Sequence, residues 1–347
     1  MQLNGQKTLT GRRLRKEYWN SWRKDYLVKY KRSLLIVVRL IVGIGLLLFL
    51  FSKADTSKVL AILKQTDFLF IVLSIILFLL AVAIISARWK ILLSAHSIDI
   101  PFHKTFSYYL VGFFFNNFLP TGVGLDIVRG VYASNNYGKK AECFASVISE
   151  RMIGFLSILL LGIFSLPLFI VKNRFILFIF LGLVFLTILF IAGIFFFLKR
   201  KTLKRFNWLF KIKILSKLKN KIKRLYNALY YYKKRKLVVF QTILLSFLFQ
   251  VILITMAFFI GKALLVEIPY YYYLAFIPVI NIASMIPITI NGIGIREGLY
   301  VFLFNLASVK SSQSILISII YLGITMVVSL SGAVIFIFGE RKTDRMV

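Results

Sequence analysis

The sequence predicts an all-α, polytopic integral membrane protein, and three observations support this fold class. Hydrophobic residues make up 59% of the 347 positions and the mean hydropathy is +0.84, well outside the range of soluble globular chains. Several apolar runs reach the roughly 20 residues that a helix needs to cross a bilayer. Lys and Arg are concentrated in two segments that flank such runs, with ten in 1–32 and sixteen in 199–236.

The predicted spans follow from the positions of the apolar runs. They are 33–51, 68–87, 152–171, 175–198, 237–260 and 315–338. Basic residues accumulate on the cytoplasmic side of membrane proteins, so we expect both basic segments and both termini in the cytoplasm, with the chain in the plasma membrane. Because the net charge of +33 is concentrated in these flanks, it predicts contact with anionic lipid and no nucleic-acid binding. Arg39 and Arg88 are expected to snorkel to the cytoplasmic surface.

With both basic segments inside, the intervening chain cannot consist of full spans only. Residues 105–150 must begin and end on the cytoplasmic side, and residues 270–312 must begin and end outside. We therefore expect a re-entrant hairpin at each place, turning near PTGVG in the first and near NGIGIREG in the second. The alternative is a pair of ordinary spans with Pro/Gly ends, which would move one basic segment outside.

The two hairpins predict an inverted duplication within a single membrane domain, 1–347. Matching features, including the two Gly-x-Gly turns, lie about 170 residues apart, as in transporters built from inverted-topology repeats. Repeat A would cover 33–171, and repeat B would cover 175–338 with the basic loop 199–236.

The two turns have the features of an internal binding site. Irregular backbone at membrane depth is tolerated where it lines a cavity, and Gly122, Gly124, Gly292 and Gly294 permit positive φ and a close approach by a ligand. A helix is expected to follow each turn, and the free N–H groups and positive dipole of a helix start favour an anion. Asn116, Asn117 and Asn291 could satisfy free backbone groups at the turns.

Ionisable groups lie beside both turns, although each costs about 2.5–3.5 kcal/mol inside a bilayer. We expect three arginines to receive a phosphate headgroup and three carboxylates to orient them. In the alternative, the same six residues form buried pairs that hold the two repeats together. The complete predicted binding set is Asn117, Pro120, Gly122, Gly124, Asp126, Arg129, Glu150, Arg151, Asn291, Gly292, Gly294, Arg296 and Glu297.

The sequence contains no signature of an enzyme. GVGLDI fails the dinucleotide fingerprint because Ile127 stands at its third glycine, and no Gly-Lys-Ser/Thr phosphate loop is present. His96 and His103 lie without acidic or cysteine partners at metal-ligand spacing, and Cys143 is the single cysteine. We therefore expect no cofactor, no metal and no catalytic activity.

Three blocks of sequence, NNFLPTGVGLDIVRG, SVISERMIG and PITINGIGIREGLY, resemble the flippase-like family that includes the transmembrane region of lysylphosphatidylglycerol synthetases. The resemblance implies movement of a lipid between leaflets. The family's charged positions fall on Asp126 and Arg129, on Glu150 and Arg151, and on Arg296 and Glu297. Leu125 stands where the family commonly has glycine, and Asn291 departs from the usual lead-in of the second turn.

The predicted function is translocation of a phospholipid or a lipid-linked phosphate or sugar between leaflets. The alternative is a membrane scaffold for a lipid-modifying enzyme or glycosyltransferase, with the basic segments docking that enzyme. Lysylphosphatidylglycerol synthesis by this chain is not expected, because the soluble synthetase domain is absent from the sequence. The expected partners are thus membrane lipids, in particular anionic or lipid-linked headgroups, and a membrane enzyme in the scaffold alternative.

Overall fold

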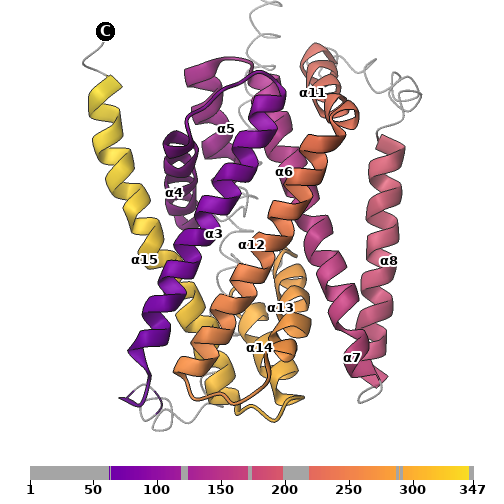
Figure 1. Ribbon diagram of the computed structural model, residues 1–347, viewed down its shortest axis with the longest axis vertical. Coiled ribbons are helices and arrows are strands. Elements are labelled where there is room, and N and C mark those ends of the chain that lie inside the picture. The colour runs from indigo at the N-terminus through magenta and orange to yellow at the C-terminus, as the bar shows by residue number, and fades with distance from the viewer. Residues whose placement is uncertain are drawn as a thin grey trace, which may run out of the picture.

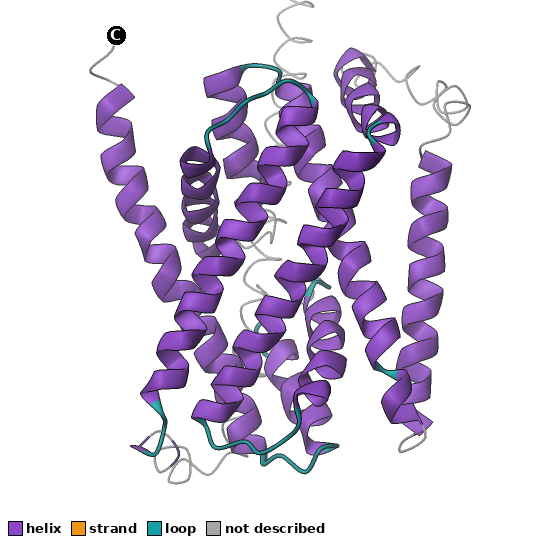
Figure 2. Ribbon diagram, viewed as in Figure 1, coloured by secondary structure: helices purple, strands orange, loops and turns teal. Residues whose placement is uncertain are grey.

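The computed structural model describes residues 62, 64–118, 124–170, 174–197, 219–286, 289 and 292–343. Within these ranges the ordered elements are helices, and no strand occurs (Figure 2). The first predicted span, 33–51, lies outside the described residues, as do the basic segment 1–32 and much of 199–236.

Five long helices match the other five predicted spans, and each is long and apolar enough to cross a membrane. They are α3 (Phe68–Ala95), α6 (Lys140–Ser165, continued by α7, Pro167–Ile170), α8 (Arg174–Phe197), α12 (Lys236–Ala263) and α15 (Ser311–Thr343). The chain is therefore an all-α membrane protein, as the sequence predicts.

Two of these helices extend well beyond the predicted spans, and this changes the location of charged residues. Helix α3 continues to Ala95, so Arg88 lies inside it and is only 7% exposed; the expected snorkelling is wrong. Helix α6 begins at Lys140, so Glu150 lies about 15 Å along the helix, at ten residues of 1.5 Å rise, and does not open the span. Both helices tolerate polar residues at depth because these residues bond to each other, as described below.

Four shorter helices form two pairs. Helices α4 (Phe102–Phe118) and α5 (Gly124–Tyr137) lie in the upper half of Figure 1, and α13 (Tyr270–Ser284) and α14 (Ile295–Asn305) lie in the lower half. The longest has 17 residues, or about 25 Å, which is less than the roughly 30 Å hydrocarbon core. Each pair therefore enters from one end of the molecule and returns to it, as the predicted hairpins do.

The long helices form the framework around these pairs. Helices α3 and α12 pack along each other at the centre (Figure 1). Helix α4 packs on α15, and α13 packs on α6, so each pair rests on the last long helix of the other half. At the first crossing, a Cβ on Gly332 would lie 2.1 Å from the carbonyl oxygen of Leu110, so glycine is required for this close approach.

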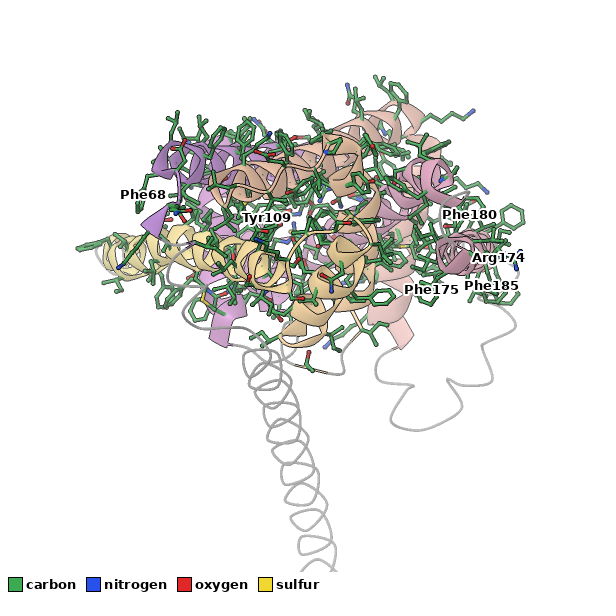
Figure 3. The ribbon with its side chains drawn as sticks, turned by 90° about the horizontal axis from the view of Figure 1, so that it is seen from below. Phe68, Tyr109, Arg174, Phe175, Phe180 and Phe185 are labelled. Carbon is green, nitrogen blue, oxygen red and sulfur yellow. The ribbon has the colours of Figure 1, made fainter. Side chains whose placement is uncertain are left out.

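Helix α8 stands at the edge of the bundle. The Phe185 side chain lies on its outer side, whereas Tyr109 lies inside the bundle (Figure 3). Phe178 is 70% exposed and Phe185 is 68% exposed, while Tyr109 is 2% exposed. An apolar surface of this kind faces lipid in a membrane protein.

Helix α11 (Lys219–Tyr231) and the short 3-10 helix η2 (Tyr232–Lys234) lie at the upper end of the bundle. The apolar side of α11 packs on α6 through Ala228 and Leu229, and Lys221 and Lys223 are exposed. Tyr232 is buried and its hydroxyl donates to the carbonyl of Leu92 at 2.9 Å, so this tyrosine holds η2 against α3.

Candidate functional site

A buried ion network surrounds Glu150 on α6. Arg88 of α3 donates to its Oε1 from Nε at 3.0 Å and from Nη2 at 2.7 Å, and Arg129 of α5 bonds to Oε2. The Tyr109 hydroxyl donates to the same carboxylate from α4. Ser246 of α12 accepts from Arg88 at 2.9 Å. Glu150 is 1% exposed, so its charge is balanced by groups of the protein. The network of bonds around it connects five helices.

Arg129 is enclosed as completely as Glu150. Its guanidinium lies 4.6 Å from the ring centre of Tyr109 and 5.1 Å from that of Trp89, positions that favour cation–π attraction. It also pairs with Asp126 at 2.7 Å, one helical turn earlier. The other oxygen of Asp126 binds Arg151 at 2.7 Å, and the Arg151 side chain is 46% exposed. Of the three arginines near Asp126 and Glu150, Arg151 is the accessible one.

A second, smaller cluster lies at the start of α14. Gly292 and Gly294 adopt φ of 73° and 87°, as the sequence predicts for this turn, whereas Gly124 is part of helix α5. The Glu297 carboxylate accepts from the Gly294 N–H at 2.5 Å and therefore occupies the helix start, where we expected an external anion. Glu297 also accepts from Arg296 at 2.7 Å and from the Ser318 hydroxyl of α15 at 2.8 Å.

A cavity of about 1050 Å³ lies between the two clusters. Its walls are mainly apolar and come from both hairpins and from α3, α6, α8, α12 and α15. The polar groups on its surface are Asn116, Asn117, Arg151, Ser284, Thr289, Gly292, Arg296, Tyr321 and Thr325. This size and this mixture of an apolar wall with a few polar groups are typical of a site for a small amphipathic ligand.

The cavity divides the predicted binding residues into three groups. Asn117, Arg151, Gly292 and Arg296 line it. Gly124, Asp126, Arg129, Glu150, Gly294 and Glu297 are described but are not among its lining residues. Pro120, Gly122 and Asn291 lie outside the described residues. The expected ion pairs between carboxylates and arginines are present, and a role in headgroup binding stays a prediction.

Several residues of the site are absent from the predicted set. Arg88, Tyr109 and Ser246 complete the network around Glu150, and Ser318 completes the Glu297 cluster. Arg88 could have been predicted from the sequence, because an arginine near the end of an apolar run needs an acidic partner if it is buried. Among the described residues, no group of three His, Cys, Asp or Glu side chains could hold a metal ion.

These features define a polytopic helical membrane protein with two short helix pairs and a central cavity that contains one arginine from each half. Comparison with known proteins identifies its family. Residues 36–332 match the family described as lysylphosphatidylglycerol synthase TM region, and the chain belongs to this family.

Two relatives are UPF0104 membrane proteins of archaea. The protein of Methanothermobacter thermautotrophicus is 22% identical over 338 residues, which cover 92% of this chain and 99% of the relative. The protein of Methanocaldococcus jannaschii is 27% identical over 138 residues, 39% of this chain and 41% of the relative. No solved structure matches the chain at a significant level.

Proposed function

We propose that this protein moves a lipid with a phosphate-bearing headgroup between the leaflets of the plasma membrane, acting as a carrier and not as an enzyme. The observation that carries the proposal is the shared cavity. Asn116 and Asn117, at the end of α4, and Ser284 and Gly292, on either side of the second turn, line the same space, although the two hairpins enter from opposite ends. A site that is lined by hairpins from both ends could open to each side in turn, as alternating access requires.

The proposal treats the two halves as inverted repeats, and the pattern of packing supports this. Helix α4 rests on α15 as α13 rests on α6, and α5 pairs with α6 as α14 pairs with α15. Helices α3 and α12, which would be equivalent, pack against each other at the centre. Rocking of one half against the other about this central pair would expose the cavity to each side in turn.

The proposed direction of the molecule in the membrane is supported by its charge. The upper end in Figure 1 is formed by α11, η2 and the start of α12, and exposed basic residues include Lys221, Lys223, Lys233 and Lys234. The bias of basic residues toward the cytoplasm therefore favours this end inside. Helix α15 ends near the same side, which is consistent with a cytoplasmic C-terminus.

The direct test is a leaflet-translocation assay in proteoliposomes with a fluorescent phospholipid. The Arg151→Gln and Arg296→Gln variants remove the two cavity arginines, and both should slow translocation at least severalfold. Arg174→Gln, an exposed arginine at the start of α8, is the matched control and should leave the rate unchanged. Unchanged translocation in a double variant that carries both Arg151→Gln and Arg296→Gln would reject the role of the cavity arginines in transport.

A scaffold for a membrane enzyme is the second candidate, and the exposed basic face of α11 favours it. Substituting Lys221, Lys223 and Arg224 by Gln should abolish capture of such an enzyme while leaving the cavity intact. If the triple variant still captures the enzyme and still translocates lipid, the scaffold role of α11 is rejected and the carrier role is kept.

A further inference from the structure

One face of helix α15 connects polar groups of the two hairpins along the cavity. Thr325 lines the cavity from this face. Seven residues before it, Ser318 accepts from Arg296 of the second hairpin at 2.9 Å. Four residues after it, Ser329 accepts from Nδ2 of Asn117 of the first hairpin at 2.7 Å. Residues at these spacings lie on one side of a helix, so a polar strip leads from Arg296 past Thr325 to Asn117 over about 16 Å.

Two neutral hydroxyls of the cavity wall can accept a hydrogen bond from a ligand but cannot donate one. Thr325 donates its O–H to the carbonyl of Leu322 at 2.7 Å. Ser284 of α13, which also lines the cavity, donates its O–H to the carbonyl of Ile280 at 2.7 Å. A hydroxyl has a single proton and two lone pairs, so each of these oxygens has only acceptor capacity for a ligand.

The amide of Asn117 can form hydrogen bonds with a ligand in both senses. The Ser329 hydroxyl donates to the carbonyl of Met326 at 2.7 Å, so its oxygen must accept from Asn117, and this fixes the amide with its nitrogen toward Ser329. The amide has an oxygen that can accept and a second N–H that can donate. The cavity therefore contains neutral acceptors from both hairpins and from α15, in addition to the guanidinium donors of Arg151 and Arg296.

From this arrangement we infer that the headgroup carries hydroxyl groups in addition to its phosphate, as glycerol or a sugar does, and that Asn117, Ser284 and Thr325 recognise these hydroxyls. This inference rests on the proposed function and specifies its substrate class. The phosphate accepts from Arg296. A hydroxyl donates, as Ser284 and Thr325 require, and also accepts, so it pairs with Asn117 in either sense. An ammonium group donates but has no lone pair, so it matches this wall less completely.

The test is lipid binding to the purified full-length protein, measured by native mass spectrometry in competition. Phosphatidylglycerol and phosphatidylinositol carry hydroxyls on glycerol and on a ring, phosphatidylpropanol has the same phosphodiester charge without them, and phosphatidylethanolamine carries an ammonium group. At least one of the hydroxyl-bearing lipids should bind about tenfold more tightly than phosphatidylpropanol, since a neutral hydrogen bond contributes up to about this factor. The tighter of the two identifies glycerol or a ring as the source of the hydroxyls. Phosphatidylethanolamine should bind no better than phosphatidylpropanol.

Variants of the acceptor residues test whether these residues cause the preference. It should fall to about twofold or less in the double variant Ser284→Ala/Thr325→Val, which removes both acceptor oxygens with little change in volume. Thr325→Ser keeps the oxygen and should keep the preference. The control is Ser331→Ala, because Ser331 donates to the carbonyl of Val328 at 2.6 Å in the same helix but is not among the lining residues. Since the lipids compete within one sample, the ratio does not depend on the fraction of protein that folds.

The possible results separate this inference from the proposed function. Equal binding of the hydroxyl-bearing lipids and phosphatidylpropanol, weakened alike by Arg296→Gln, would overturn the recognition of hydroxyls and leave the phosphate carrier standing. The same conclusion would follow if phosphatidylethanolamine bound as tightly as the hydroxyl-bearing lipids, or if the preference persisted in the double variant. Binding that is indifferent to Arg296→Gln and to the double variant would overturn both.

Discussion

The two charged clusters of this protein use the same residue types in different ways. Around Glu150, two arginines and a tyrosine converge on one carboxylate that is 1% exposed, and the contacts join α3, α4, α5 and α6. At the start of α14, one arginine pairs with the adjacent glutamate, and the arginine lines the cavity. The first cluster stabilises the framework, whereas the second presents a charge to the cavity. Arg151 connects the two roles, since it pairs with Asp126 and also lines the cavity.

The largest effect is expected for Glu150→Gln, which tests whether the first cluster is structural. Removing the carboxylate leaves Arg88 and Arg129 buried with a single remaining negative partner, Asp126, and loss of one member of a buried ion pair costs about 3–5 kcal/mol. The free energy of unfolding in detergent should fall by this amount. Glu142→Gln, in the first turn of the same helix, is the control and should change it by less than about 1 kcal/mol. Equal stability of the two variants would show that Glu150 is not the centre of a structural network.

A smaller loss is expected for Glu297→Gln. Glutamine keeps one oxygen, so it can replace either Oε2, which accepts from Gly294, or Oε1, which accepts from Arg296 and Ser318. The variant therefore loses the charge and at least one of these bonds, at a cost of about 1.5–3 kcal/mol. Measured in the same unfolding experiment, this variant should lie between Glu150→Gln and the wild type. If Glu297→Gln were the more destabilising of the two, the distinction between the clusters would be reversed.

The contact between α4 and α15 allows a test of the two hairpins. Alanine at Gly332 would place its Cβ 2.1 Å from the Leu110 carbonyl oxygen, and separating the helices should cost about 1–3 kcal/mol. Gly323→Ala is the matched control in the same helix, because a Cβ there meets nothing within 4 Å. In α6, a Cβ on Gly162 would lie 3.7 Å from Pro278 of α13, an ordinary contact, and 2.8 Å from the flexible side chain of Leu183 of α8, so Gly162→Ala should cost less. Thermal unfolding of the three variants should rank Gly332→Ala lowest, and any other order would contradict this account of the crossing.

The smallest effect is expected for Ser318→Ala. Its hydroxyl donates to Glu297 at 2.8 Å and accepts from Arg296 at 2.9 Å, and loss of such a neutral partner costs about 0.5–1.5 kcal/mol. Since Ser318 orients Arg296, the affinity for an anionic lipid should fall a fewfold, whereas affinity for phosphatidylcholine should not change. A uniform loss for both lipids would indicate a general loss of folding instead of a change in Arg296.

Much of the fold could be predicted because each element depends on local sequence. The spans follow from the length of the apolar runs, and the start of α14 at Ile295 follows from the glycines before it. The pairing of Asp126 with Arg129 follows from a spacing of three residues on one helix. In each case the interacting residues are neighbours in the chain, and helix geometry alone brings them together.

The remainder of the site depends on contacts between distant segments. Arg88 and Glu150 are 62 residues apart, and Glu297 and Ser318 are 21 apart, so no local pattern connects them. Arg88 was expected at the membrane surface because snorkelling is the usual solution for an isolated arginine, but Glu150 supplies a partner at depth. The apolar wall of the cavity has no sequence signal, since Phe155 and Phe249 resemble any other residues of a span.

The central claim is that the cavity holds a headgroup and opens to each side of the membrane, and a cysteine placed in it tests this claim most directly. Cys143 is the single cysteine, so Cys143→Ser gives a background without thiols. In this background, Ser284→Cys reports on the cavity, while Ser97→Cys and Lys310→Cys report on the exposed surfaces at the two ends. In proteoliposomes, an impermeant maleimide should reach position 284 from either side and react more slowly when phosphatidic acid is present. Reaction from one side only, at a rate that no lipid changes, would contradict the account.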